Sequence, residues 1–166
     1  MDFINETYTS PSKEFVVNFP PLVHPNAADT AYPNQVFVDF FVGSGYWTPL
    51  GLHTIEWVKL PQKITVEQFQ ESLPNVIDEH VKNRFATNGK FTVIEQKQIP
   101  NQESHKFLAK GTYKGVSSTL ICTIKWYKDR IAFISKVLPD DNHAPIKALG
   151  VNTDGYNKWV QSFRVL

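Results

Sequence analysis

The sequence has a single cysteine and almost no imbalance of charge. The first feature excludes some kinds of site, and the second disfavours one class of partner. With Cys122 alone, the chain cannot form an internal disulfide or a metal site built from several thiolates. Its 17 Lys and Arg residues against 16 Asp and Glu residues leave a formal net charge of +1. Such a balance provides no overall field to hold a polyanion, so nucleic acid is disfavoured as a partner.

Long apolar runs and leader features are also lacking. No stretch approaches the roughly 18 apolar residues that a membrane-spanning helix needs, so no membrane span is predicted. Residues 1–13 have neither the basic start nor the apolar middle of a secretion signal. The sequence as it stands therefore predicts a cytoplasmic protein. A periplasmic or lumenal protein whose leader had been removed would show the same pattern.

Aromatic side chains, by contrast, are abundant: the 166 residues include 12 Phe, 6 Tyr and 4 Trp. Rings are enriched in strands, so this composition favours a sheet over a helical bundle. A chain of this length can bury about two-thirds of its unfolded surface in one core. We expect a polar lead-in over residues 1–13, followed by a single α+β domain over residues 14–166.

The segment from Ser104 to Leu138 carries the clearest pattern. Its residues alternate between apolar and polar with period two in three consecutive runs, which indicates strands. Two short joints separate the runs, one at Lys114-Gly115 and one at Lys128-Asp129, and both are short enough for hairpins. We predict an antiparallel three-strand unit, with a type I turn and a one-residue bulge at Gly115.

The rest of the chain supplies further strands and two helices. Residues 14–19, 36–42, 53–60 and 91–99 read as strands, whereas residues 21–34 are rich in turn formers and read as a loop. Thr65 and Gln68 match a capping box before a helix that ends near Asn88, with Pro74 inside it as a kink. We predict an antiparallel sheet of about six or seven strands, sandwiched between this helix and a C-terminal helix.

No catalytic or metal-binding set emerges. Cys122 is in phase with apolar neighbours on a predicted central strand, so we interpret it as a core residue and not a nucleophile. The five histidines show no metal-ligand spacing, and we predict neither a metal nor another cofactor. The segment Gly43-Ser44-Gly45 follows a strand, but its neighbours fit neither a nucleophile elbow nor a phosphate loop.

The most unusual stretch is Gly43 to Gly51, where glycines flank two large aromatic residues, Tyr46 and Trp47. Tyr and Trp are enriched at binding hot spots, although such rings also serve as buried lids. His53 follows the stretch and is the histidine best placed to join a site there. Tyr46, Trp47 and His53 are therefore the candidate binding residues, and no catalytic residue is predicted.

The order and boundary residues of the elements resemble those of the PsbP-like group. The resemblance rests on a first strand ending Phe19-Pro20, a strand ending Leu60-Pro61, a helix opening at Thr65, the Lys128-Asp129-Arg130 turn and a closing Trp159-Val160-Gln161-Ser162-Phe163. This superfamily includes the extrinsic photosystem II subunit, a nuclear Ran-binding protein and bacterial DcrB-like proteins. The resemblance implies an antiparallel sheet between helices. Because members of the group are mostly non-enzymatic adaptors, it also implies a non-enzymatic adaptor role.

Together these observations predict a soluble, non-catalytic binding or accessory protein of PsbP-like type, which acts through contacts with another protein. The alternative is a protein that binds an apolar small ligand, or a small enzyme, with its pocket near Trp47 and His53. A pocket ringed by polar groups that converge with His53 would favour the alternative, whereas a flat exposed aromatic patch would favour an adaptor.

Overall fold

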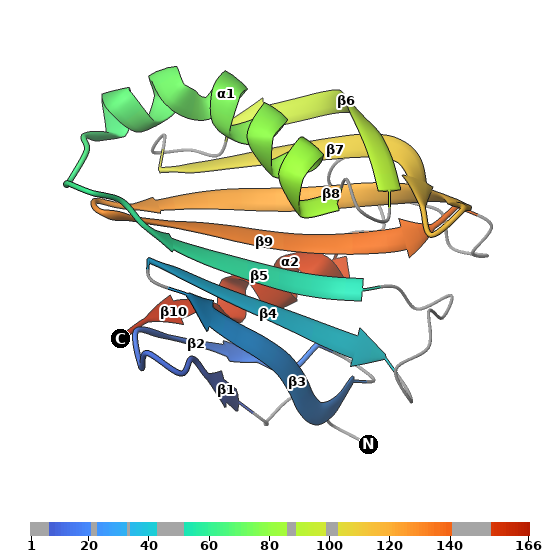
Figure 1. The fold of residues 1–166 in the computed structure, drawn as a ribbon, viewed down its shortest axis with the longest axis horizontal. Helices are drawn as coiled ribbons and strands as arrows, with labels where there is room; N and C mark the ends of the chain where they lie inside the picture. The colour runs from blue at the N-terminus through green and yellow to red at the C-terminus, as the bar shows by residue number, and fades with distance from the viewer. Residues whose placement is uncertain are drawn as a thin grey trace.

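The computed structural model describes residues 7–20, 23–32, 34–42, 52–85, 89–98, 103–140 and 154–166. Within these ranges two helices and ten strands form an α+β fold with two antiparallel sheets (Figure 1). The seven-stranded sheet has the spatial order β3 (Val23–Tyr32), β4 (Gln35–Val42), β5 (Leu52–Lys59), β9 (Arg130–Pro139), β8 (Val116–Tyr127), β7 (Ser104–Tyr113), β6 (Gly89–Gln98). The three-stranded sheet has β2 (Phe15–Asn18) between β1 (Thr7–Thr9) and β10 (Arg164–Val165). The helices are α1 (Val66–Phe85) and α2 (Asp154–Ser162).

The predicted three-strand unit is confirmed as β7, β8 and β9. Its first turn differs from the prediction: Tyr113 pairs directly with Val116, and the two residues between them both have positive φ, 50° at Lys114 and 77° at Gly115. This is the conformation of a type I′ turn, whose twist matches that of the flanking strands, so no bulge is needed. The predicted helix is confirmed over Val66–Phe85, where Pro74 lies inside one continuous helix, and residues 86–88 at its predicted end lie outside the described ranges.

The capping box predicted at the start of α1 is present. The backbone N–H of Gln68 donates to Thr65 Oγ1 at 3.1 Å, and the backbone N–H of Thr65 donates to Gln68 Oε1 at 2.9 Å. Two N–H groups that the helix itself cannot satisfy are thereby paired. This cap fixes where α1 begins, and so where its first turns lie relative to the sheet.

Two sequence-based expectations need correction. Residues 21–34 were predicted to be a loop, but Val23–Tyr32 form β3, paired with β4. Because β3 is an edge strand with one neighbour, its polar residues and Pro25 are tolerated, and the period-two signal is weak. The predicted single sheet is also incomplete, since residues 14–19 contribute β2 to a second sheet, together with β1 from the expected lead-in.

The seven-stranded sheet has a hydrophobic core on each face. On one face α1 packs against β6 to β9, and this core includes Phe69, Leu73, Phe107 and Cys122, which is fully buried as predicted. The other core joins β4, β5, β8 and β9 to β2 and α2, and it includes Trp159. The sheet therefore lies between α1 on one side and α2 with the small sheet on the other.

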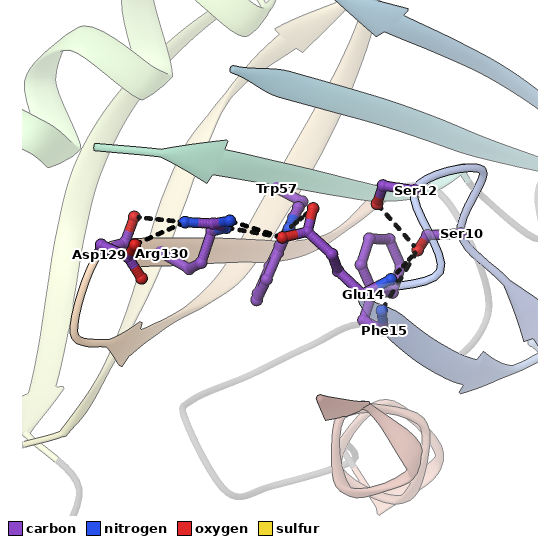
Figure 2. Close-up of polar contacts among 7 residues, drawn as sticks. All are labelled: Ser10, Ser12, Glu14, Phe15, Trp57, Asp129 and Arg130. Atoms are coloured by element: carbon purple, nitrogen blue, oxygen red, sulfur yellow. Dashed lines mark hydrogen bonds and ion pairs between the residues drawn. The ribbon is translucent and has the colours of Figure 1, made fainter. Parts of the chain in front are cut away.

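A polar cluster around Glu14 ties the small sheet to the large one (Figure 2). Arg130, at the start of β9, donates to Glu14 Oε1 through Nε at 2.9 Å and through Nη2 at 2.7 Å. Trp57 of β5 donates from Nε1 to Glu14 Oε2 at 3.2 Å. Arg130 Nη1 also lies 2.9 Å from Asp129 Oδ2 in the turn before β9. Arg130 thus links this turn to Glu14, which directly precedes β2.

Glu14 should make stability depend on pH in the acid range. Burial alone would raise the pKa of its carboxyl, but hydrogen bonds from Arg130, Trp57 and Ser12, with the charge of Arg130, lower it below the ordinary 4.5. A lowered pKa means that this stabilisation is present above 4.5 and is lost as the pH falls through the folded-state value. We expect Glu14→Gln to cost about 1 kcal/mol at neutral pH and to reduce the acid slope in urea unfolding.

Glu71→Gln, on the exposed side of α1, is the matched control and should leave both quantities unchanged. Some acid slope should persist in Glu14→Gln, because hydrogen bonds and the charge of Lys110 also lower the pKa of Asp140 despite its burial. An acid slope identical to that of the wild type would contradict the assignment to Glu14.

Candidate binding groove

A groove lies between α1 and the part of the sheet that this helix does not cover. In Figure 1, α1 lies over the β6 to β9 half of the sheet, whereas β3 and β4 are away from it. The groove has a volume of about 690 Å³, within the usual range of ligand-binding clefts. Its lining comes from β3, β4, β5, β9, α1 and the residue after β5: Thr30, Gln35, Phe37, Asp39, Glu56, Val58, Leu60, Val76, Glu79, His80, Asn83, Ile131, Phe133.

Strand register determines the floor of the groove. Glu56 of β5 pairs with Phe37 of β4 on one side and with Phe133 of β9 on the other. Side chains of directly paired residues share a face of the sheet and lie about 5 Å apart at Cβ. A single carboxylate thus stands between two phenyl rings. Val58 lies two residues after Glu56 on β5 and pairs with Gln35 on one side and Ile131 on the other. Val58 and Ile131 make that end of the floor more apolar.

The wall is formed by one stripe of α1. Val76, Glu79, His80 and Asn83 follow the three-and-four spacing that places side chains on one side of a helix. Glu79 and Asn83 are exposed, whereas the His80 side chain is only 2% exposed. The wall therefore presents polar groups at the rim and an imidazole at its base.

His80 is held in one orientation by contacts at both ring nitrogens and at the ring face. Its Nδ1 lies 3.0 Å from Glu56 Oε2, and its Nε2 lies 3.4 Å from Ser135 Oγ. The imidazole also stacks on Phe133, with centroids 4.4 Å apart and planes 15° apart. Because both nitrogens and the ring face are engaged, His80 joins α1 to β5 and β9 and orients the carboxylate on the groove floor.

The series Ser135, His80 and Glu56 has the order of a serine–histidine–acid relay, but its geometry does not support nucleophilic catalysis. Ser135 is fully buried and does not line the groove. It pairs with Thr54 on β5 and with Cys122 on β8, so its strand has no free edge to provide backbone donors for an oxyanion. Burial also raises the pKa of the Cys122 thiol to about 12, which suppresses the reactive thiolate.

Of the sequence-predicted binding residues, only His53 lies within the described ranges, and it does not line this groove. Tyr46 and Trp47 lie outside the described residues. His53 is on β5 but in the opposite phase to Glu56, so it faces α2, where its ring meets Trp159 edge-on with centroids 4.9 Å apart. It is 3% exposed, and its Nδ1 has no hydrogen-bond partner among the described residues. Within the described residues, no group of three or more His, Cys, Asp or Glu is placed to hold a metal.

The sequence did contain a signal for the groove. In the sequence, His80 is a polar residue at the three-and-four spacing of the apolar residues Leu73, Val76 and Ile77, and Glu56 alternates with apolar residues of the predicted strand. A polar residue in an apolar stripe needs a polar partner once buried. What the sequence cannot supply is the register that brings the two together.

Burial of His53 gives a second expectation about pH. Burial, and then the charge of Lys136, hold the pKa of His53 well below the ordinary 6.5. In the unfolded chain His53 therefore binds a proton near pH 6.5, whereas in the folded chain it stays neutral at that pH. The free energy of unfolding falls as the pH drops below that value. The slope should reach up to about 1.4 kcal/mol per pH unit for this one group.

We expect His53→Leu to flatten the dependence of unfolding free energy on pH between about 5 and 7, as measured by urea unfolding. Stability at higher pH should change little, because the unpaired buried Nδ1 is removed with the ring. His105→Gln provides a comparison: burial also lowers the pKa of His105, so this variant should remove a separate part of the slope. An unchanged pH profile for His53→Leu would contradict the placement of His53.

Comparison with solved structures finds the same fold in proteins of very low sequence identity. Cyanobacterial PsbP (CyanoP) from Synechocystis sp. PCC 6803 matches with a TM-score of 0.66 and 9% identity, over 97% of this chain and 92% of that one. The Ran-binding protein Mog1p from Saccharomyces cerevisiae matches with a TM-score of 0.54 and 10% identity, over 96% and 94%. The predicted resemblance to the PsbP-like group is thus confirmed as one of fold.

A protein from Bacteroides thetaiotaomicron matches with a TM-score of 0.55 and 10% identity, over 98% of this chain but 49% of that one. The chain therefore spans about half the length of that relative. No family model matches the chain, and no curated protein matches its sequence. Neither helix in the described ranges is long and apolar enough to cross a membrane.

Proposed function

We propose that this chain is a soluble, non-catalytic accessory protein that binds another protein through the groove between α1 and strands β3, β4, β5 and β9. The observation that carries the proposal is the mixed floor, in which the carboxylate of Glu56 lies between Phe133, which His80 of α1 partly covers, and Phe37 on the neighbouring strand β4. Aromatic surface with a few oriented polar groups is typical of recognition sites.

The fold neighbours agree with this proposal without identifying a partner. One of them, Mog1p, is a Ran-binding protein. Side chains behind the groove add a chemical reason, because Ser135 beside His80 and its strand neighbour Cys122 are buried and unsuited to nucleophilic attack. Binding is therefore the activity that the described side chains support best.

A small ligand is the second candidate, because a volume of about 690 Å³ also suits a small molecule. The site would then differ from the pocket predicted near Trp47 and His53, since His53 faces the other side of the sheet. Native mass spectrometry of protein isolated from its own source separates the two candidates. A retained small molecule at one copy per chain would favour the second, and a retained protein the first.

Charge reversal at the rim tests the groove itself. Glu79→Lys changes an exposed residue of the wall, and Glu71→Lys makes the same change elsewhere on α1, also at an exposed position. Cross-linking in source lysate, read by quantitative mass spectrometry, should yield a partner with the wild type and with Glu71→Lys. Recovery with Glu79→Lys should be lower by about tenfold. Equal recovery of the partner with all three proteins would show that the groove is not the binding site.

A further inference from the structure

The groove differs in charge from the rest of the chain. The whole sequence is nearly balanced, with 17 basic and 16 acidic residues. The described residues that line the groove, however, include the carboxylates Asp39, Glu56 and Glu79 and neither lysine nor arginine. A cationic group is thus the complement of this site.

Glu56 is the centre of that charge. Its side chain is 14% exposed, so its carboxylate is largely removed from water yet open to the groove. His80 engages Oε2, and a carboxylate has a second oxygen that can accept hydrogen bonds from a ligand. A carboxylate in such a setting gains more from a charged donor than an exposed one does, because less water competes for it.

The neighbouring rings decide which cation fits. Phe37 and Phe133 flank Glu56 across the strands, and Phe133 is itself covered on one face by His80. A guanidinium is planar, stacks on aromatic rings and donates several N–H groups to a carboxylate in one plane. A lysine ammonium is more strongly hydrated and lacks that planar fork. The combination of rings and carboxylate favours arginine.

We propose that the groove recognises an arginine side chain of the partner protein, with its guanidinium against Glu56 and beside Phe37. This proposal rests on the proposed function and specifies the chemistry of the partner. The same partner segment places an apolar side chain at the end of the groove formed by Val58, Leu60 and Val76. Glu79, on the wall, adds charge attraction at the rim.

Selection from a phage display library of short random peptides tests the proposal without knowledge of the partner. Peptides are selected on the wild-type chain, and those that also bind Glu79→Lys are discarded. We expect the remaining peptides to share an arginine next to an apolar residue. Groove-dependent peptides without arginine, or with lysine equally often, would overturn the arginine assignment and leave the proposed function standing. A selection that yields no groove-dependent peptide would overturn both.

Affinity measurements then test the role of Glu56. The best selected peptide is compared with a version in which citrulline, a neutral isostere, replaces arginine, and both are titrated against the wild type and Glu56→Gln. Citrulline should weaken binding to the wild type by about tenfold or more. Glu56→Gln should bind both peptides with similar low affinity, because the charge that distinguishes them is gone.

Two controls keep this result interpretable. Glu56→Gln retains an acceptor oxygen for His80, so the variant should stay folded, which a thermal melt checks directly. Glu71→Gln, outside the groove, should bind the arginine peptide as the wild type does. A Glu56→Gln protein that is folded and still prefers arginine over citrulline by the wild-type factor would refute the assignment of Glu56.

Discussion

Replacing Phe15 with alanine should lower the free energy of unfolding by about 3 to 5 kcal/mol. Phe15 is fully buried, and its ring centroid lies 5.1 Å from that of Phe163 and 5.4 Å from that of Trp57. It therefore joins β2 to the end of α2 and to β5. Removing the ring leaves a cavity where the small sheet meets the large one, and the aromatic contacts are lost with it.

Local polar contacts make relaxation around the cavity difficult. The backbone N–H groups of Glu14 and Phe15 both donate to Ser10 Oγ, at 3.0 Å and 3.2 Å, and Glu14 itself is fixed by Arg130 (Figure 2). Because these contacts restrain the backbone at Glu14 and Phe15, the surrounding residues cannot simply move in. The effect should be near the upper part of the range for large-to-small substitutions.

Denaturant unfolding of wild type and Phe15→Ala measures this effect directly. Val165→Ala is the matched control in the same sheet, because Val165 is 43% exposed and pairs with Phe15 across the strands. Its change should stay within about 0.5 kcal/mol. A loss below about 1 kcal/mol for Phe15→Ala would mean that the small sheet does not pack on the large one.

The elements predicted best from sequence are those whose signal is local. The three-strand unit shows strict alternation, and Thr65 with Gln68 marks the start of α1, so each could be assigned from nearby residues. β3 could not, because an edge strand needs apolar residues on fewer sides and its polar sequence resembles a loop. The small sheet was missed since it joins residues from opposite ends of the chain, β2 with β10.

The candidate groove depends even more on long-range register. Glu56 and His80 are 24 residues apart and meet only when α1 has packed on the sheet. Composition alone points to a local set of unusual residues, Tyr46 and Trp47 with His53. Strand alternation alone places His53 and Glu56, three residues apart, on opposite faces of the sheet, but it does not show which face the groove occupies.

Gly111→Ala should destabilise the protein by about 3 kcal/mol, at the upper end of the usual cost of overpacking. A Cβ on Gly111 would lie 1.8 Å from the backbone oxygen of Lys90 and 2.8 Å from Phe91 Cα. These are backbone atoms of the neighbouring strand β6, so no side-chain rotation can relieve the overlap. β6 would have to move away from β7, its only neighbour in the large sheet.

That displacement would also disturb the core under α1. Phe91, which pairs with Gly111, is buried against Phe85 near the end of the helix, with ring centroids 5.8 Å apart. Moving β6 therefore weakens both its pairing with β7 and its contact with α1. Amide hydrogen exchange should show the loss of protection first in β6, because an edge strand can separate without disrupting the rest of the sheet.

Two other glycines separate steric overlap from the general effect of adding a methyl group. In Gly155→Ala, in α2, the added Cβ would meet no atom of the described residues within 4 Å, and the change should be neutral or stabilising by less than about 1 kcal/mol, as is usual in a helix. Gly115→Ala also meets nothing, but its φ of 77° should cost about 1 kcal/mol. Urea unfolding of the three variants should thus give Gly111→Ala a much lower free energy of unfolding than Gly115→Ala, and Gly115→Ala a lower one than Gly155→Ala. A Gly111→Ala protein as stable as Gly155→Ala would show that β6 does not approach β7 at this register.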